Sequence, residues 1–356
     1  MTRLVVLGLI AALQLSFIIF TLVLLFVTRL RGSRWKARGY DAERSLAGPL
    51  RRIMLGEDRG EELAEALGQL RPDVAVREFL AIGGARLSPE QRRSLALLVR
   101  PAGWIEQTLS QAASGKWWKR MEAARLSSMV CDERDERMVA RLVTDPHAAV
   151  ASAATVAIAG CASRLLVESV VRGLADRPLS IRLQQCNALR SHADFTTTIV
   201  VDLLSRPASA PELRAWVQLV EVLATPDALA AVVPLASHPD VEIRTSTARA
   251  LRSCFSPEGA EAVTRLLRDE DWRVRAAAAR AVGALNVKNA IPLLSECMGD
   301  EAWWVRFRAG LALADLSQEG RAALDRIRNS PDPFARDMAT LIGGLSDGGR
   351  LELTSV

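Results

Sequence analysis

The sequence has few of the residues that build metal centres and nucleophilic sites. It contains three histidines, five cysteines and a single tyrosine in 356 residues, beside eight tryptophans. The histidines stand far apart and none adjoins a glutamate, so no set of ligands would converge on a metal ion. The cysteines form no Cys-x-x-Cys pair, and an odd, dispersed set is typical of a reducing compartment. We therefore predict no metal and no cofactor.

Motifs of the common catalytic sites are also missing. We find no glycine-rich phosphate loop, no nucleophile elbow and no persuasive pair of catalytic acids. The glycine pairs at 343–344 and 348–349 stand near the end of the chain, where they indicate the end of the last helix and a tail. We therefore predict that the protein is not an enzyme.

Acidic residues are absent from the first 40 residues, which hold six basic ones. The formal net charge of +5 comes from this segment, because 40 basic and 41 acidic residues remain after Tyr40. A nearly neutral remainder lacks the positive surface that phosphate backbones attract. We therefore predict no nucleic-acid partner.

Charge of either sign is absent from 4–28, a run of 25 residues rich in Leu, Ile, Val and Phe. At about 1.5 Å per residue, this run is long enough to cross a hydrocarbon layer of about 30 Å, so we predict a transmembrane anchor. The alternative is a cleaved signal peptide. Its apolar region would be shorter, about 7–15 residues, and Arg29-Leu30-Arg31 stands where small residues would precede the cut.

Basic residues indicate the orientation of this anchor. Five lie between Arg29 and Arg38, and only Arg3 precedes the run. The positive-inside rule places the more basic flank in the cytoplasm. We therefore predict a single-pass protein of the inner (plasma) membrane, with its N-terminus outside and its C-terminal region cytoplasmic.

What the sequence does contain is a repeat with a period of about 31 residues. An aliphatic residue followed by arginine recurs at Ile243-Arg244, Val274-Arg275 and Val305-Arg306, with less regular pairs on either side. A fixed period of this length is typical of stacked helical repeats. We predict helix pairs over 261–267 with 272–285 and over 290–298 with 301–316, and less regular helices over 59–70 and 89–99.

Alanine dominates the inner columns of this repeat. Positions four and seven residues after the aliphatic residue include Ala278, Ala281, Ala309 and Ala312. These positions share one face of an α-helix, where alanine lets neighbouring helices approach closely and a bulky residue would overpack the stack. Cys161 and Cys254 stand eleven residues after the aliphatic residue, on the same face, and are predicted to be small buried residues.

These features resemble HEAT-repeat proteins, in particular the short-repeat subgroup related to phycobilin lyases. In that family a proline in the first helix precedes an aspartate in the turn and a Val-Arg pair in the second helix. Pro292, Asp300, Val305 and Arg306 match this spacing, and Asp271, Val274 and Arg275 match its second part. The resemblance implies an all-α, right-handed α-solenoid of helix pairs with a period of about 31 residues. It is strongest from about 140 to 345.

The resemblance also implies separate roles for the arginines. The turn aspartates and the arginines of the Val-Arg pairs would form a structural ladder between repeats, made of Arg244, Asp271, Arg275, Asp300 and Arg306. The second helices would line a concave face. Arginines six and nine residues after the aliphatic position could form a basic stripe there, next to tryptophans that could form an aromatic one. The alternatives are a solvated helix face and tryptophans that cover the edge between helices. The candidate partner-binding residues are Arg125, Arg190, Arg249, Arg252, Arg280, Trp117, Trp272, Trp303 and Trp304.

We predict five segments: an anchor at 1–28, a basic juxtamembrane segment at 29–40, degenerate helical repeats at 41–140, regular HEAT repeats at 141–346 and a tail at 347–356. The predicted function is a membrane-anchored cytoplasmic scaffold that binds a membrane-associated protein partner, without enzymatic activity. Similar bacterial membrane-anchored HEAT proteins suggest a membrane glycosyltransferase or a signalling complex as that partner. The alternative is a lyase-like enzyme or enzyme subunit of the phycobilin-lyase-repeat type.

Overall fold

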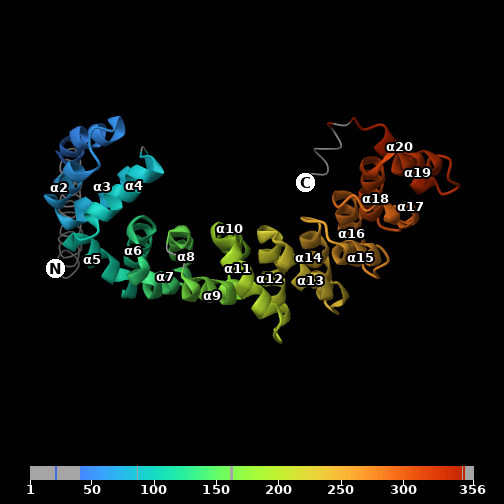
Figure 1. Cartoon of the computed structure of the whole chain (residues 1–356), viewed down its shortest axis with the longest axis horizontal. Coiled ribbons are helices and arrows are strands. Elements are labelled where there is room, and N and C mark those ends of the chain that lie inside the picture. The colour runs from blue at the N-terminus through green and yellow to red at the C-terminus, as the bar shows by residue number, and fades with distance from the viewer. Residues whose placement is uncertain (1–20, 22–40, 86, 161–162, 347, 349–356) are drawn as a thin grey trace, which may run out of the picture. The chain divides into compact units, whose positions relative to one another are not determined.

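Helices and turns make up the part of the chain that the computed structural model describes, which is residues 21, 41–85, 87–160, 163–346 and 348 (Figure 1). These residues contain no strand, and the all-α prediction is confirmed for them. The chain divides into two compact units, Met1–Val130 and Cys131–Val356. The finer segment boundaries given above stay predictions.

The predicted membrane location is wrong. Among the described residues, no helix is long and apolar enough to cross a membrane. The predicted anchor at 1–28 and the basic segment at 29–40 lie outside the described residues, apart from Thr21. The prediction depended on the length of an uncharged run, and a run of sufficient length does not by itself establish a spanning helix. The single-pass location is therefore not retained.

The first unit contains a helical stretch at 41–55 followed by further helices. A capping box fixes the N-terminus of the helix that begins at Pro89, which is the predicted position. The Gln91 amide donates to the Ser88 hydroxyl (3.2 Å), and the Ser88 amide donates to the Gln91 side chain (2.9 Å). A helix predicted at 59–70 is shorter, because Gly60 adopts a left-handed conformation (φ 112°) just before it. The helices are α2 (Glu61–Gly68), α3 (Pro72–Ala85), α4 (Pro89–Val99), α5 (Gly103–Leu109) and α6 (Trp117–Val130).

The second unit is a stack of helix pairs joined by short turns. Its first helices form one row and its second helices another, and consecutive second helices pack against each other from α12 to α18 (Figure 1). The first helices are α7 (Glu136–Val143), α9 (Arg164–Gly173), α11 (Ala193–Leu204), α13 (Pro226–Val232), α15 (Pro257–Leu266), α17 (Ile291–Cys297) and α19 (Gln318–Ile327). The second helices are α8 (Ala148–Thr155), α10 (Leu179–Leu189), α12 (Ala210–Leu223), α14 (Val241–Leu251), α16 (Trp272–Ala284), α18 (Trp303–Leu316) and α20 (Pro333–Gly343).

Small residues let the second helices approach closely, as the sequence predicts. The alanines at 278, 281, 309 and 312 are all buried. A Cβ atom added to Gly283 on α16 would stand 3.0 Å from the Ala312 Cβ and 3.2 Å from its Cα on α18. The two helices are therefore in near contact there, and the joint has no room for another methyl group.

We expect Gly283→Val to lower the free energy of unfolding by about 1–3 kcal/mol, because the added side chain must push α18 away. The neighbouring Ala284→Val is the matched control, since Ala284 is exposed on the same helix. Urea unfolding followed by circular dichroism measures both. Helix propensity alone favours the opposite order, because valine improves on glycine and is worse than alanine. An Ala284→Val variant that is the less stable of the two would contradict the packing argument.

Arginines near the start of the second helices tie neighbouring repeats together. Arg275 on α16 donates to both carboxylate oxygens of Asp300, over 2.6 Å from Nε and 2.9 Å from Nη2. Its Nη1 donates to the carbonyls of Asp269 and Glu270, at 2.8 and 2.9 Å. Arg244 on α14 repeats the geometry with the Asp269 carboxylate (2.8 and 2.9 Å) and two carbonyls of its own turn. Each of these arginines thus joins its own turn to the turn of the next repeat.

The buried acid that Arg244 binds is Asp269, not Asp271, and the exposed Glu270 adds a longer contact of 3.3 Å. Asp271 caps α16, where its carboxylate accepts hydrogen bonds from the Arg273 guanidinium (3.0 Å) and amide (2.8 Å). These bonds hold the pKa of Asp271 at about 2. Asp300 stands five residues before Val305, and the same step back from Val274 leads to residue 269. In this repeat, the aspartate equivalent to Asp300 is therefore Asp269, not the predicted Asp271.

Arg306 occupies the next ladder position but has a different neighbour. Its Nη1 donates to the carbonyls of Asp300 (2.6 Å) and Glu301 (3.1 Å), as in the other repeats. One repeat on from Asp300, where the other two arginines would lead us to expect an aspartate, the sequence has Pro331. The Phe334 ring lies 5.2 Å from the Arg306 guanidinium. An aromatic contact therefore stands where the ladder would have its next acid.

Candidate functional site

Two of the five arginines predicted to bind a partner line one cavity of about 250 Å³. They are Arg252, at the end of α14, and Arg280 on α16. Arg249 lies one turn before Arg252 and is exposed. Arg190, which follows α10, and Arg125, on α6 of the first unit, do not line this cavity.

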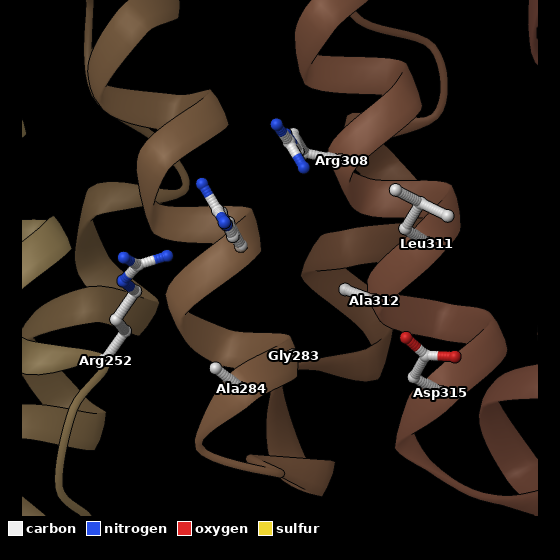
Figure 2. A pocket seen from close by; sticks show the side chains of 8 residues that line it. Arg252, Gly283, Ala284, Arg308, Leu311, Ala312 and Asp315 are labelled. Carbon is white, nitrogen blue, oxygen red and sulfur yellow. The ribbon is translucent and has the colours of Figure 1, made fainter. Parts of the chain in front are cut away.

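Arg308 on α18 is a third arginine at this cavity, and the sequence analysis missed it. We call the space the arginine cavity; it is lined by Arg252, Arg280, Arg308, Leu311, Asp315 and small residues of α16 and α18. Figure 2 shows Arg308 at one end of the α18 wall, Asp315 at the other and Leu311 between them.

The sequence contains a signal for this set of arginines. Arg252, Arg280 and Arg308 are evenly spaced along the chain, and each step falls about one helical turn short of a full repeat. Each arginine therefore stands about one turn earlier in its helix than the previous one, and the three lie on a diagonal across the stack of second helices. No fixed position of the repeat contains all of them.

Positive charge exceeds negative charge around this cavity. Glu221 on α12 is an acid that faces α14, 3.5 Å from Arg252 and 4.0 Å from Arg249. Burial lowers the pKa of Arg280, and repulsion from Arg252 and Arg308 lowers it further, against attraction by Glu221. Burial and repulsion from Arg252 also lower the pKa of Arg308. Since guanidinium groups stay charged in proteins, crowding them in this way favours binding of an anion.

An aromatic cluster lies beside the arginine cavity on the first turns of α18. Trp303 stacks on Phe307, with ring centroids 4.8 Å apart and planes 12° apart, and meets Trp304 edge to face at 4.8 Å. Trp303 and Trp304 remain 44% and 50% exposed, whereas Phe307 is buried. The Arg308 guanidinium lies 5.8 Å from the Phe307 ring, so the α18 aromatic cluster (Trp303, Trp304 and Phe307) adjoins the cavity.

Exposed aromatic residues recur at the start of the last three second helices. Trp272, Trp303 and Phe334 stand at the same position of three consecutive repeats, each in the first turn of its helix and each exposed. A search for tryptophan alone overlooks Phe334. In the first unit, Trp117 and Trp118 begin α6 with their rings edge to face at 6.2 Å, and Lys116 lies 5.5 Å from the Trp118 ring.

The cysteines and histidines provide no second site among the described residues, where no group could hold a metal ion. Cys186 and Cys297 are buried, and burial raises their pKa values to about 12 and about 11, which makes them poor nucleophiles. Cys254 is exposed, contrary to the prediction, because α14 ends at Leu251 and its inner face does not continue that far. Cys161 lies outside the described residues.

The family model for HEAT repeats matches residues 260–341, from α15 to α20. This match supports the predicted HEAT-repeat resemblance over the segment that holds most of the arginine cavity and the α18 aromatic cluster. No curated protein matches the chain.

Solved helical proteins align with most of the chain at low similarity. An engineered protein aligns with 84% of this chain and 97% of its own, at 17% identity and a TM-score of 0.36. The Escherichia coli protein YibA aligns with 80% of this chain and 96% of its own, at 15% identity and a TM-score of 0.37. Kap121p bound to Ste12p aligns with 84% of this chain and 45% of its own, at 12% identity and a TM-score of 0.36. Similarity at this level carries no argument about function.

Proposed function

We propose that the second unit is a non-catalytic scaffold that binds a protein partner through the surface of α18. One observation carries this proposal: exposed, mutually packed tryptophans stand directly beside a cavity lined by three arginines. Tryptophan and arginine are among the residue types most enriched in the hot spots of protein interfaces. Trp303, Trp304 and Arg308 share α18, so this helix presents both residue types.

Preorganisation of the α18 aromatic cluster favours binding further. The stacking of Trp303 on Phe307 and its edge contact with Trp304 hold the rings in place before any partner arrives. A partner that covers them therefore loses little side-chain entropy on binding and gains the burial of large apolar surfaces.

We expect Trp304→Ala to weaken partner binding about 30-fold, the effect of a hot-spot residue. The matched control is Trp118→Ala, because Trp118 has the same exposure (51% against 50%), also lies in the first turn of its helix and packs edge to face on its neighbour. Partners are captured from detergent extracts after crosslinking, and their direct binding to the purified chain is then titrated. A captured protein whose affinity falls equally with both substitutions, or with neither, would contradict the proposal.

The lyase-like alternative makes a separate prediction about the same preparation. A protein of that kind would carry a bound chromophore or prosthetic group, which absorbance and mass spectrometry detect. No contact among the described residues favours it over the scaffold.

A further inference from the structure

The arginine cavity has the chemistry to recognise one kind of partner segment. We propose that it binds the carboxylate side chain of an extended acidic peptide of the partner, so that the peptide crosses α14, α16 and α18. This inference deepens the proposed function and depends on it. Three features of the cavity support it: its size, its charge and the two residues on the α18 wall.

The size of the cavity suits a side chain rather than a secondary-structure element. Its volume of about 250 Å³ exceeds the roughly 30 Å³ that a water molecule occupies, so a carboxylate side chain and a few waters fit. A helix, about 10 Å across, does not fit. The near contact between Gly283 and Ala312 also shows that α16 and α18 lie against each other here, so no helix fits between them.

The charges around the cavity select an anion. The charged residues that line the cavity are Arg252, Arg280, Arg308 and one acid, Asp315, which leaves an excess of two positive charges. Outside the lining, the charge of Glu221 is matched by that of Arg249, 4.0 Å away. Arg280 and Arg308 already interact within the protein, but a guanidinium has five N–H donors and can add a carboxylate to its existing contacts. Arginine also pairs with carboxylates through two parallel hydrogen bonds, which gives geometric specificity as well as affinity.

The α18 wall favours a peptide over a small inorganic anion. The exposed Asp315 carboxylate repels a phosphate dianion, but it accepts hydrogen bonds from the backbone N–H groups of a peptide. Buried Leu311, between Arg308 and Asp315, provides an apolar contact for the methylene groups of a glutamate (Figure 2). Residues flanking that glutamate would reach the α18 aromatic cluster, which adjoins Arg308 through Phe307.

The length of the peptide follows from the spacing of the helices. Neighbouring packed helices lie about 8–10 Å apart, so three of them span about 20 Å. An extended chain of about six residues covers that distance. A fluorescein-labelled peptide somewhat longer than this, which alternates glutamate and glycine, is therefore a sufficient probe, and its glutamine counterpart is the uncharged control.

The experiment is fluorescence polarisation with the full chain, supported by thermal unfolding of each variant. We expect the glutamate peptide to bind at low salt, and Arg280→Gln and Arg308→Gln each to weaken it about tenfold or more. Arg265→Gln is the matched control, since it removes the same charge from an exposed position in the last turn of α15, outside the cavity, and should leave the affinity unchanged. Asp315→Asn should improve competition by inorganic phosphate, because it removes the repelling carboxylate.

Four results would each overturn the inference. The first is equal binding of the glutamate and glutamine peptides, and the second is an Arg265→Gln loss as large as that of Arg280→Gln in variants that remain folded. The third is displacement of the peptide by phosphate at the concentration at which free peptide displaces it, which would indicate a phosphate site. The fourth is displacement by single-stranded oligonucleotides, which would indicate a nucleic-acid surface. Each of these results leaves the proposed function intact if a protein partner still depends on Trp304. Conversely, peptide binding that depends on Arg280, without any partner that depends on Trp304, would support the cavity and contradict the α18 surface.

Discussion

Replacing Asp269 by asparagine is expected to lower the free energy of unfolding by about 3–5 kcal/mol. The substitution preserves the shape of the side chain. It also preserves an oxygen that can accept the hydrogen bond from the Asp271 amide, which is 2.9 Å long. What it removes is the negative charge beside Arg244. Both side chains of this pair are only 8% exposed, so the guanidinium would be left buried beside a neutral amide. The Glu270 carboxylate, 3.3 Å from Arg244 but 84% exposed, is a much weaker partner. Hydrogen bonds and attraction from Asp269 raise the pKa of Arg244, because they favour the charged guanidinium.

An exposed ion pair provides the control for this prediction. Asp202 on α11 pairs with Arg206, which follows the end of that helix, and their side chains are 49% and 56% exposed, so Asp202→Asn should cost less than about 1 kcal/mol. The double substitution Asp269→Leu with Arg244→Met should cost less than Asp269→Asn alone, because no unpaired charge remains in the interior. Urea unfolding at neutral pH measures all three. If Asp269→Asn were no more damaging than Asp202→Asn, the ladder would contribute nothing to the stability of the stack.

The ladder also shows how far the sequence determines this fold. The period of the repeat is visible because alanines and Val-Arg pairs must recur wherever one helix pair stacks on the next. The partner of each arginine is harder to identify from the sequence. Asp269 and Asp271 stand in the same turn, and aspartate suits both an ion pair with arginine and the cap of a helix. One of them binds Arg244, and the other caps a helix. Only the side-chain geometry distinguishes these roles.

The candidate site was predictable in its residue types and not in its arrangement. Arginines in the second helices and tryptophans at their starts were expected to form stripes along the repeat. The structure instead gathers Arg252, Arg280 and Arg308 on a diagonal, at successively earlier positions of three neighbouring second helices. The three arginines stand at different distances from the aliphatic residue of their own repeat, yet they line the same cavity. No single position of the repeat therefore identifies all three.

Trp216 is buried within the stack, unlike the exposed tryptophans at the helix starts. It lies on α12, is only 4% exposed and donates a hydrogen bond from Nε1 to the Val171 carbonyl over 3.0 Å. Val171 belongs to α9, the first helix of an earlier repeat, and is itself fully buried. Trp216 therefore joins two repeats both by packing and through a polar contact that no water can replace.

Trp216→Ala is expected to lower the free energy of unfolding by about 3–5 kcal/mol, because it leaves a cavity the size of an indole ring between two repeats. Trp216→Phe should cost about 1–3 kcal/mol, since the phenyl ring fills much of the space but leaves the Val171 carbonyl buried without a donor. Trp304→Ala should change stability far less than Trp216→Ala, because half of its side chain is already in solvent. Thermal and urea unfolding of the three variants test this order. If Trp304→Ala destabilised the protein as much as Trp216→Ala, the exposed tryptophans would serve packing, and the surface proposed here for a partner would instead be part of the stack.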